Sequence, residues 1–173
     1  MFNDGFNHLT ENTDDFYPES LQDNIETLND RIYETVNNGV YRAGFATTQT
    51  AYEKAYYVLF DSLDWIEGIL SQHRYLAGNK ITEADWRLFT TLIRFDAVYF
   101  GHFKCNRQAL KDYPNISNYI RELYQTPGVA ETVSFEHIKT HYYVSHTSIN
   151  PTGVIPLGPK QDFSEPHNRG LLT

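Results

Sequence analysis

Apolar residues recur at steps of three and four along most of this chain, and this spacing constrains its fold most strongly. Only an α-helix brings positions with that spacing onto one face. The first run predicts a helix from about residue 18, with the apolar positions Leu21, Ile25, Leu28, Ile32 and Val36. A second run predicts a helix that ends near Gln72, with the positions Tyr52, Tyr56, Leu59, Leu63, Ile66 and Leu70.

The residues between these runs predict how the helices end and begin. Asn37-Asn38-Gly39 is expected to stop the first helix, because glycine tolerates the left-handed conformation in which many helices end. Residues 39–45 are too short and too apolar for a flexible linker, so we expect a packed connection. Thr50 and Glu53 fit a capping box near the start of the second helix.

Residues 81–86, Ile-Thr-Glu-Ala-Asp-Trp, carry the clearest local signal. Thr82 can accept a hydrogen bond from the backbone N–H of Asp85, while the Asp85 carboxylate reaches back to the N–H of Thr82. A helix is predicted to follow, with Leu88, Leu92, Phe95 and Tyr99 on one face. We therefore assign Thr82 and Asp85 a structural role as the N-terminal cap of this helix.

Two further helices complete the predicted fold. Pro114 opens one that Thr126-Pro127-Gly128 closes, and a shorter one spans about Phe135 to Tyr143. Beyond Tyr143, frequent proline and glycine leave no room for a regular element. No convincing strand pattern occurs, so we predict one all-α domain of five or so helices: a lead-in over residues 1–17, a helical bundle over 18–143 and an extended tail over 144–173.

The composition narrows the function. A formal charge of −8 disfavours nucleic acid and anionic membrane surfaces as partners. Aromatic residues make up 15% of the chain, and many tyrosines interrupt apolar stripes where a phenol needs a polar partner, which favours a cleft over a sealed core. With a single cysteine and no secretory signal, the chain is expected to be cytoplasmic.

Several other residues have an ordinary structural interpretation. Cys105, the single cysteine, is expected to be a small packed residue and not a nucleophile. His137 and His141 are four residues apart with His146 nearby, yet no established zinc-binding string occurs, so we expect no metal site. Trp65 and Trp86 are expected to be core or interface aromatics.

Five stretches of the sequence together resemble a known family. The Tyr75–Asn79 turn followed by the 81–85 capping box resembles the C-terminal domain of glutathione transferases. Residues 37–46, 94–105 and His141-Tyr142 with 149–153 narrow the resemblance to the Xi class, the glutathionyl-hydroquinone reductases. The resemblance covers essentially the whole chain.

The resemblance implies that half of the enzyme lies outside this sequence. The family's other half is a thioredoxin-like domain whose Cys-Pro motif supplies the nucleophile and which holds most of the glutathione, the co-substrate. No such motif occurs in this chain, which by itself is therefore expected to contain no catalytic residue and to be inactive. Its implied role is to bind the aromatic ring of a glutathionyl-hydroquinone and to form a homodimer.

The same resemblance places Tyr41 and Tyr142 where phenols hydrogen-bond the hydroquinone oxygens. A phenol stays protonated at neutral pH, so it can donate to an oxygen that gains negative charge. Without the resemblance, Tyr41 would be interpreted as a packed loop aromatic and Tyr142 as a core residue at a helix end.

Two other functions remain open at this stage. Transferase-like helical domains also occur as interaction scaffolds without glutathione chemistry. A conventional conjugating transferase, which activates glutathione with a Ser or Tyr hydroxyl, would differ from a reductase in the domain that is missing here.

Overall fold

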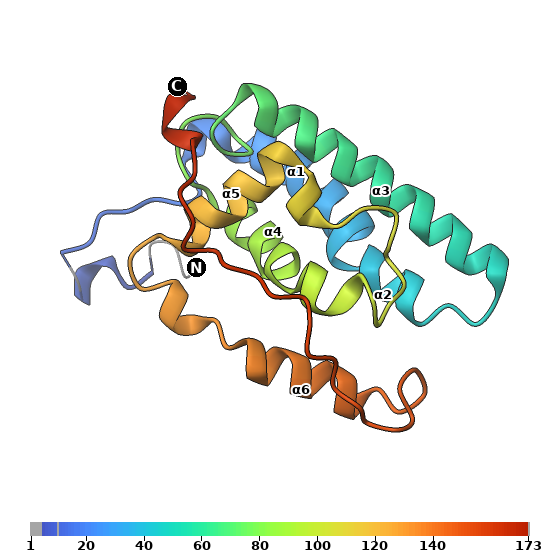
Figure 1. Ribbon diagram of the computed structural model, residues 1–173. Coiled ribbons are helices and arrows are strands. Elements are labelled where there is room, and N and C mark those ends of the chain that lie inside the picture. The colour runs from blue at the N-terminus through green and yellow to red at the C-terminus, as the bar shows by residue number, and fades with distance from the viewer. Residues whose placement is uncertain (1–4, 10, 173) are drawn as a thin grey trace.

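The computed structural model describes residues 5–9 and 11–172, and within these ranges every named element of secondary structure is a helix or helical turn, with no β-strand. This confirms the predicted all-α class. Figure 1 shows the bundle and the long C-terminal segment that runs across it. The helices are α1 (Gln22–Ile32), α2 (Gly39–Gly44), α3 (Gln49–Gln72), α4 (Glu83–Arg94), α5 (Pro114–Tyr124) and α6 (Phe135–Ser145). In these described ranges, no helix is both long and apolar enough to cross a bilayer.

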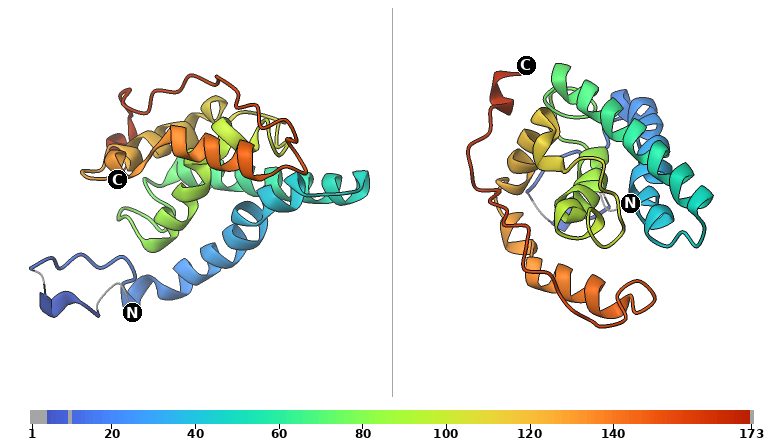
Figure 2. Two further views of the ribbon diagram at one scale, coloured as in Figure 1. Left: turned by 90° about the horizontal axis from the view of Figure 1, so that it is seen from below. Right: turned by 45° about the vertical axis from the view of Figure 1, so that its right-hand side comes forward.

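Helix α4 lies at the centre of the fold. It packs against α1 and α5, and its continuation contacts α6. Figure 2 shows α3 on one side of this central helix and α6 on the other. The predicted apolar stripes form the core, as their most buried members show: Ile25, Ile32, Val36, Leu59, Leu63, Ile66, Leu70, Leu88 and Leu92.

The predicted stop at Asn37-Asn38-Gly39 is wrong. Asn38 is right-handed, with φ −84° and ψ −26°, and Gly39 begins α2. The chain instead widens into a π turn, η3 (Tyr33–Asn37), and then remains helical. Val40 and Ala43 continue the buried stripe, so burial favours helix over termination. The expected packed connection is therefore buried as predicted, but it is a helix.

A second π turn, η4 (Phe95–Tyr99), prolongs α4 in the same way. In each π turn a backbone N–H bonds the carbonyl five residues earlier, Asn38 to Tyr33 and Phe100 to Phe95, both at 2.9 Å. Such turns hold one residue more than an ordinary helical turn.

Helix α3 ends at Gln72 as predicted, but its N-terminal cap differs from the prediction. The side chain of Thr48 accepts a hydrogen bond from the N–H of Ala51 at 3.2 Å, so Thr48 is the cap and the helix begins at Gln49. The predicted capping box of Thr50 and Glu53 is wrong because both residues already lie inside the first turns. The glutamate side chain accepts from Gln49 instead.

The capping box of Thr82 and Asp85 is present at the start of α4. The Asp85 carboxylate, fully buried, accepts from the Thr82 N–H at 2.8 Å and the Thr82 hydroxyl at 3.0 Å. It also accepts from the Leu76 N–H at 3.0 Å and the Tyr119 hydroxyl at 2.7 Å. Asp85 is thus a cap and also links α4 to α5 and to the preceding turn.

The tail is extended, as predicted, apart from a short 3-10 turn at Arg169–Leu171. It runs back past α6 and α5 (Figure 1). Beside α6, the Lys139 amine donates to the Leu157 carbonyl at 3.0 Å. Arg169 anchors its end: the buried guanidinium donates to the carbonyls of Leu70, His73 and Arg74 at the end of α3. Sequence reasoning missed this anchor.

Candidate functional site

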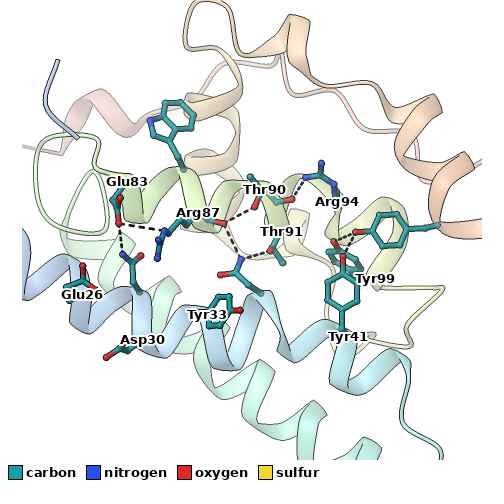
Figure 3. A pocket seen from close by; sticks show the side chains of 14 residues that line it. Glu26, Asp30, Tyr33, Tyr41, Glu83, Arg87, Thr90, Thr91, Arg94 and Tyr99 are labelled. Atoms are coloured by element: carbon teal, nitrogen blue, oxygen red, sulfur yellow. Dashed lines mark hydrogen bonds and ion pairs between the residues drawn. The ribbon is translucent and has the colours of Figure 1, made fainter. Parts of the chain in front are cut away.

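A cavity of about 1060 Å³ opens between α1 with its π turn η3 on one side and α4 on the other, with α2 and α6 at one end. Figure 3 shows its walls. Its lining combines acidic, basic and aromatic side chains: Glu26, Asn29, Asp30, Tyr33, Asn37, Tyr41, Glu83, Trp86, Arg87, Thr90, Thr91, Arg94, Tyr99 and Tyr142. We call it the main cavity.

Three phenol hydroxyls meet at one end of the main cavity. The hydroxyls of Tyr41 and Tyr142 lie 2.5 Å apart, and those of Tyr99 and Tyr142 lie 2.8 Å apart. Tyr41 comes from α2, Tyr99 from η4 and Tyr142 from α6. The family resemblance predicts that Tyr41 and Tyr142 contact the same ligand, and the structure brings these two side chains together. We call the three residues the phenol cluster.

Tyr99 is the member that sequence reasoning missed. It was assigned to the apolar stripe of α4, and it is indeed buried, with 2% of its surface exposed. The available signal was that Tyr99 lies within residues 94–105, one of the stretches that carry the family resemblance.

Aromatic packing holds the phenol cluster in place. The ring of Phe103 stacks on Tyr99 with centroids 5.4 Å apart, and it contacts Tyr41 at 5.3 Å. Phe103 also lies directly against Gly44, where a Cβ atom would come within 2.2 Å of the ring. Glycine at position 44 therefore lets α2 approach the aromatic residues that follow η4.

Burial sets the ionisation of the cluster. It raises the pKa of Tyr142 to about 12, and the hydrogen bond to Tyr41 contributes to the rise. Burial raises the pKa of Tyr99 further, with the hydrogen bond to Tyr142 as the second cause. Both phenols are therefore protonated at neutral pH and can act as hydrogen-bond donors.

The two ends of the main cavity carry opposite charge. Glu26, Asp30 and Glu83 lie at the end away from the phenol cluster, and Arg94 lies beside the cluster (Figure 3). Arg87 lies between the ends and pairs with Glu83 at 3.6 Å. An anionic group in this cavity would therefore be drawn toward the phenol cluster.

A second cavity, of about 650 Å³, adjoins the first on the other side of α4. Its walls are largely apolar, and it shares Trp86, Thr90 and Arg94 with the main cavity. Trp86 was expected to be a core or interface aromatic, yet its side chain lines both cavities. Trp65 lies elsewhere, under the guanidinium of Arg31 at 4.3 Å from the ring centroid.

Cys105 is a packed residue, as expected. Its thiol is fully buried and lies 3.8 Å from the carbonyl oxygen of Phe103 and 4.0 Å from that of Val40. Burial raises the pKa of this thiol to about 12. The thiolate needed for nucleophilic attack is therefore scarce at neutral pH.

The candidate histidines do not form one cluster. His137 is exposed and lines the second cavity. His146 lies with His102, from the turn after η4, so that the His102 Nε2 and His146 Nδ1 atoms are 3.2 Å apart. Among the described residues, no group of three or more His, Cys, Asp and Glu side chains has the arrangement of a metal site.

Comparison with known proteins identifies similar chains. Residues 49–122 match the family described as "Glutathione S-transferase, C-terminal domain". The chain is 56% identical over 171 residues to the glutathionyl-hydroquinone reductase YqjG of Escherichia coli, covering 99% of this chain and 52% of that protein. It is 52% identical over 161 residues to the glutathionyl-hydroquinone reductase PcpF of Sphingobium chlorophenolicum, covering 93% and 51%.

Solved structures show the same similarity. The glutathione-bound structure of YqjG superposes with a TM-score of 0.97 at 56% identity and covers 99% of this chain and 56% of that one. The Xi-class glutathione transferase of Natrialba magadii superposes with a TM-score of 0.97 at 48% identity and covers 99% and 53%. This chain thus spans about half the length of the relatives it matches.

Proposed function

The chain belongs to the Xi-class glutathione transferases, the family of the glutathionyl-hydroquinone reductases, and from this premise we propose that it is the substrate-binding half of such a reductase. In this proposal the full-length protein removes glutathione from glutathionyl-hydroquinones. The nucleophilic cysteine belongs to a thioredoxin-like domain outside these 173 residues, and the chain alone is inactive.

The phenol cluster carries this proposal. The Tyr142 hydroxyl lies 2.5 Å from that of Tyr41 and 2.8 Å from that of Tyr99, and the three come from separate elements. They meet at the positively charged end of a cavity large enough for an aromatic ring. Tyr41 is 38% exposed, so the cluster reaches from the buried core to the cavity surface. Such an arrangement suits an aromatic ligand with oxygen substituents.

The proposed reaction transfers the glutathione sulfur from the ring to the enzyme cysteine and then to a second glutathione. The hydroquinone ring first shifts to its keto tautomer, in which one hydroxyl proton has moved to the carbon that bears sulfur. The cysteine thiolate then attacks the glutathione sulfur, the carbon–sulfur bond breaks, and its electron pair forms a ring C=C bond while the neighbouring carbonyl oxygen gains negative charge and takes up a proton. The products are the hydroquinone and a disulfide between enzyme and glutathione. A second glutathione thiolate attacks this disulfide, which releases oxidised glutathione and restores the cysteine.

Tyr41 and Tyr142 act in this reaction as hydrogen-bond donors to the ring oxygens. Negative charge grows on an oxygen as the carbon–sulfur bond breaks, and a donor fixed in advance stabilises that charge. Tyr99 is a positioning residue: its hydroxyl lies in the core, 2.8 Å from that of Tyr142, and a proton donated by Tyr99 in this hydrogen bond leaves the Tyr142 proton for the cavity. The pKa of Tyr142, raised by burial to about 12, keeps that proton on the phenol at neutral pH.

We also propose that the full-length protein is a homodimer. Tyr57 and Val58 on α3 are exposed to 69% and 43% and provide apolar surface for an interface.

The test is the turnover of a glutathionyl-hydroquinone by the full-length protein. Tyr41→Phe and Tyr142→Phe should each lower kcat by at least about 10-fold, because each removes a donor to the developing charge. Tyr99→Phe should lower kcat with little change in KM, since it acts through Tyr142. Tyr124→Phe is the matched control, because that hydroxyl has no hydrogen-bond partner in the described structure and lies outside both cavities.

Mass spectrometry of the same protein after exposure to the substrate separates the other functions. A glutathione adduct on a cysteine outside this chain supports the reductase. Turnover of electrophiles with no adduct at any stage would identify a conjugating transferase, and absence of both would favour a scaffold. Equal kcat in the Tyr41, Tyr142 and Tyr124 variants would refute the assigned role of the phenol cluster.

A further inference from the structure

Arg94 is a cation without an anion in an otherwise acidic molecule. Every other arginine of the described chain either pairs with a carboxylate or, like Arg169, has its guanidinium bonded to several carbonyls. Arg94 donates only to the Thr90 carbonyl one turn earlier in its own helix. Since a buried or half-buried charge without a partner is unfavourable, its charge is available for a ligand.

The position of Arg94 connects two spaces. It is the last residue of α4 and lines both the main cavity and the second cavity. Figure 3 shows its side chain between Thr90 and the phenol cluster. Its positive charge also acts on the cluster, since it opposes the rise that burial causes in the pKa of Tyr142.

The second cavity lacks negative charge. Among the described residues that line it, none is acidic, although the whole chain has a formal charge of −8. Its polar side chains are Arg94, His137, Thr90, Thr132 and Ser134. Its apolar side chains are Phe89, Ile93, Val129, Val133 and Ile138, with Trp86 at the shared wall. Such a lining suits a substituent with an apolar part, which would contact the apolar walls, and a negatively charged group, which would face Arg94.

We propose that Arg94 and the second cavity form a subsite for a carboxylate-bearing substituent on the substrate's hydroquinone ring. This inference rests on the proposed function and deepens it. The phenol cluster holds the ring oxygens, and a substituent next to one of these oxygens passes Arg94 on its way into the second cavity. The acidic end of the main cavity repels the same carboxylate, so both charges favour one orientation of the ring.

The subsite predicts a preference among substrates. A glutathionyl-hydroquinone with a ring carboxylate gains a charge-assisted hydrogen bond to Arg94 that is lacking in a conjugate whose ring is uncharged, which we call the neutral conjugate. Such bonds correspond to about 10-fold or more in affinity. The full-length protein should therefore show a kcat/KM at least about 10-fold higher for the carboxylated conjugate than for the neutral one.

The test compares Arg94→Gln, Arg94→Lys and the parent protein on both conjugates. Arg94→Gln should abolish the preference, so that the kcat/KM values of the two conjugates come within about 2-fold of each other, whereas Arg94→Lys, which keeps the charge, should retain most of the preference. Arg42→Gln is the matched control, because it also removes one positive charge. The native Arg42 lies on α2, pairs with Glu34 and lines neither cavity.

A binding measurement separates this proposal from the proposed reaction. Titration of the full-length protein with 2,5-dihydroxybenzoate and with unsubstituted hydroquinone, measured by isothermal titration calorimetry, needs no turnover. If the parent protein binds 2,5-dihydroxybenzoate more tightly than hydroquinone and Arg94→Gln loses this difference, the subsite is supported even if no conjugate is reduced. Equal losses for both conjugates in Arg94→Gln, or no preference in the parent protein, would overturn it.

Discussion

Asp85 should contribute far more to stability than an ordinary helix cap. A lost N-terminal cap costs about 1 kcal/mol. In this structure Asp85→Ala would also leave four buried donors without this acceptor: the N–H groups of Leu76 and Thr82 and the hydroxyls of Thr82 and Tyr119. Each buried donor left unsatisfied costs about 1 to 3 kcal/mol.

The expected total follows from these contributions and one opposing effect. Burial raises the pKa of Asp85, so removing the carboxylate also removes the unfavourable desolvation of its charge. We therefore expect the lower end of the summed range, a loss of about 5 kcal/mol in the free energy of unfolding. Domains of this kind are stabilised by about 5 to 15 kcal/mol. The variant should remain folded at low temperature and melt about 10 °C lower.

Urea unfolding of the chain, followed by circular dichroism at 222 nm, measures this loss. Glu83→Ala is the matched control, because Glu83 is an acidic residue in the same first turn but is partly exposed. It removes the helix-dipole charge, the ion pair with Arg87 and the hydrogen bond from the Asn29 amide, and should cost about 1 to 2 kcal/mol. Tyr119→Phe should cost about 1 kcal/mol. If Asp85→Ala destabilised the protein no more than Glu83→Ala, the buried network would have no energetic role.

Two further predictions concern packing and pH. Gly44→Ala should lower the free energy of unfolding by about 1 to 3 kcal/mol, because its Cβ would meet the Phe103 ring at 2.2 Å. Gly68→Ala has open space around it and should raise the free energy of unfolding by about 0.5 to 1 kcal/mol. Equal effects of the two variants in urea unfolding would contradict the close contact between Gly44 and Phe103. Burial lowers the pKa values of His102 and His146, so the folded state binds fewer protons than the unfolded state, and the free energy of unfolding should fall as pH drops through about 6.5. His102→Asn with His146→Asn should reduce this fall, and an unchanged pH dependence would count against it.

The helices that could be predicted are those in which one face is continuously apolar. The stripes of α3 and α5 end where an amphipathic interpretation places them, and the capping box of Thr82 and Asp85 formed because its hydrogen bonds are local. The error at Gly39 has the opposite origin. A Gly after two Asn residues looks like a stop signal, but burial of Val40 and Ala43 outweighs that local preference.

The site was predictable only in part, for a related reason. The resemblance identified Tyr41 and Tyr142, and these two side chains meet. Tyr99 and Arg94 were hidden because each belongs to a helix whose pattern explains it fully without a ligand. Arg169 was hidden because its partners are backbone carbonyls nearly one hundred residues earlier, and no pattern in the side chains reports such contacts.

The two π turns connect these observations. A turn with one extra residue rotates everything after it by about 100° relative to a regular helix. Tyr41 follows η3 and Tyr99 closes η4, so both phenols are directed by an irregularity that periodicity cannot predict.

Polar side chains hold the widened turns open. The Asn37 amide donates to the Thr91 hydroxyl at 2.6 Å and to the Arg87 carbonyl at 3.1 Å, which ties η3 to α4. Asp96 accepts from the N–H groups of Leu110 and Lys111 at 2.7 and 3.2 Å, which ties η4 to the segment before α5. Because the turns set where Tyr41 and Tyr99 point, Asn37 and Asp96 determine the geometry of the phenol cluster without contacting it.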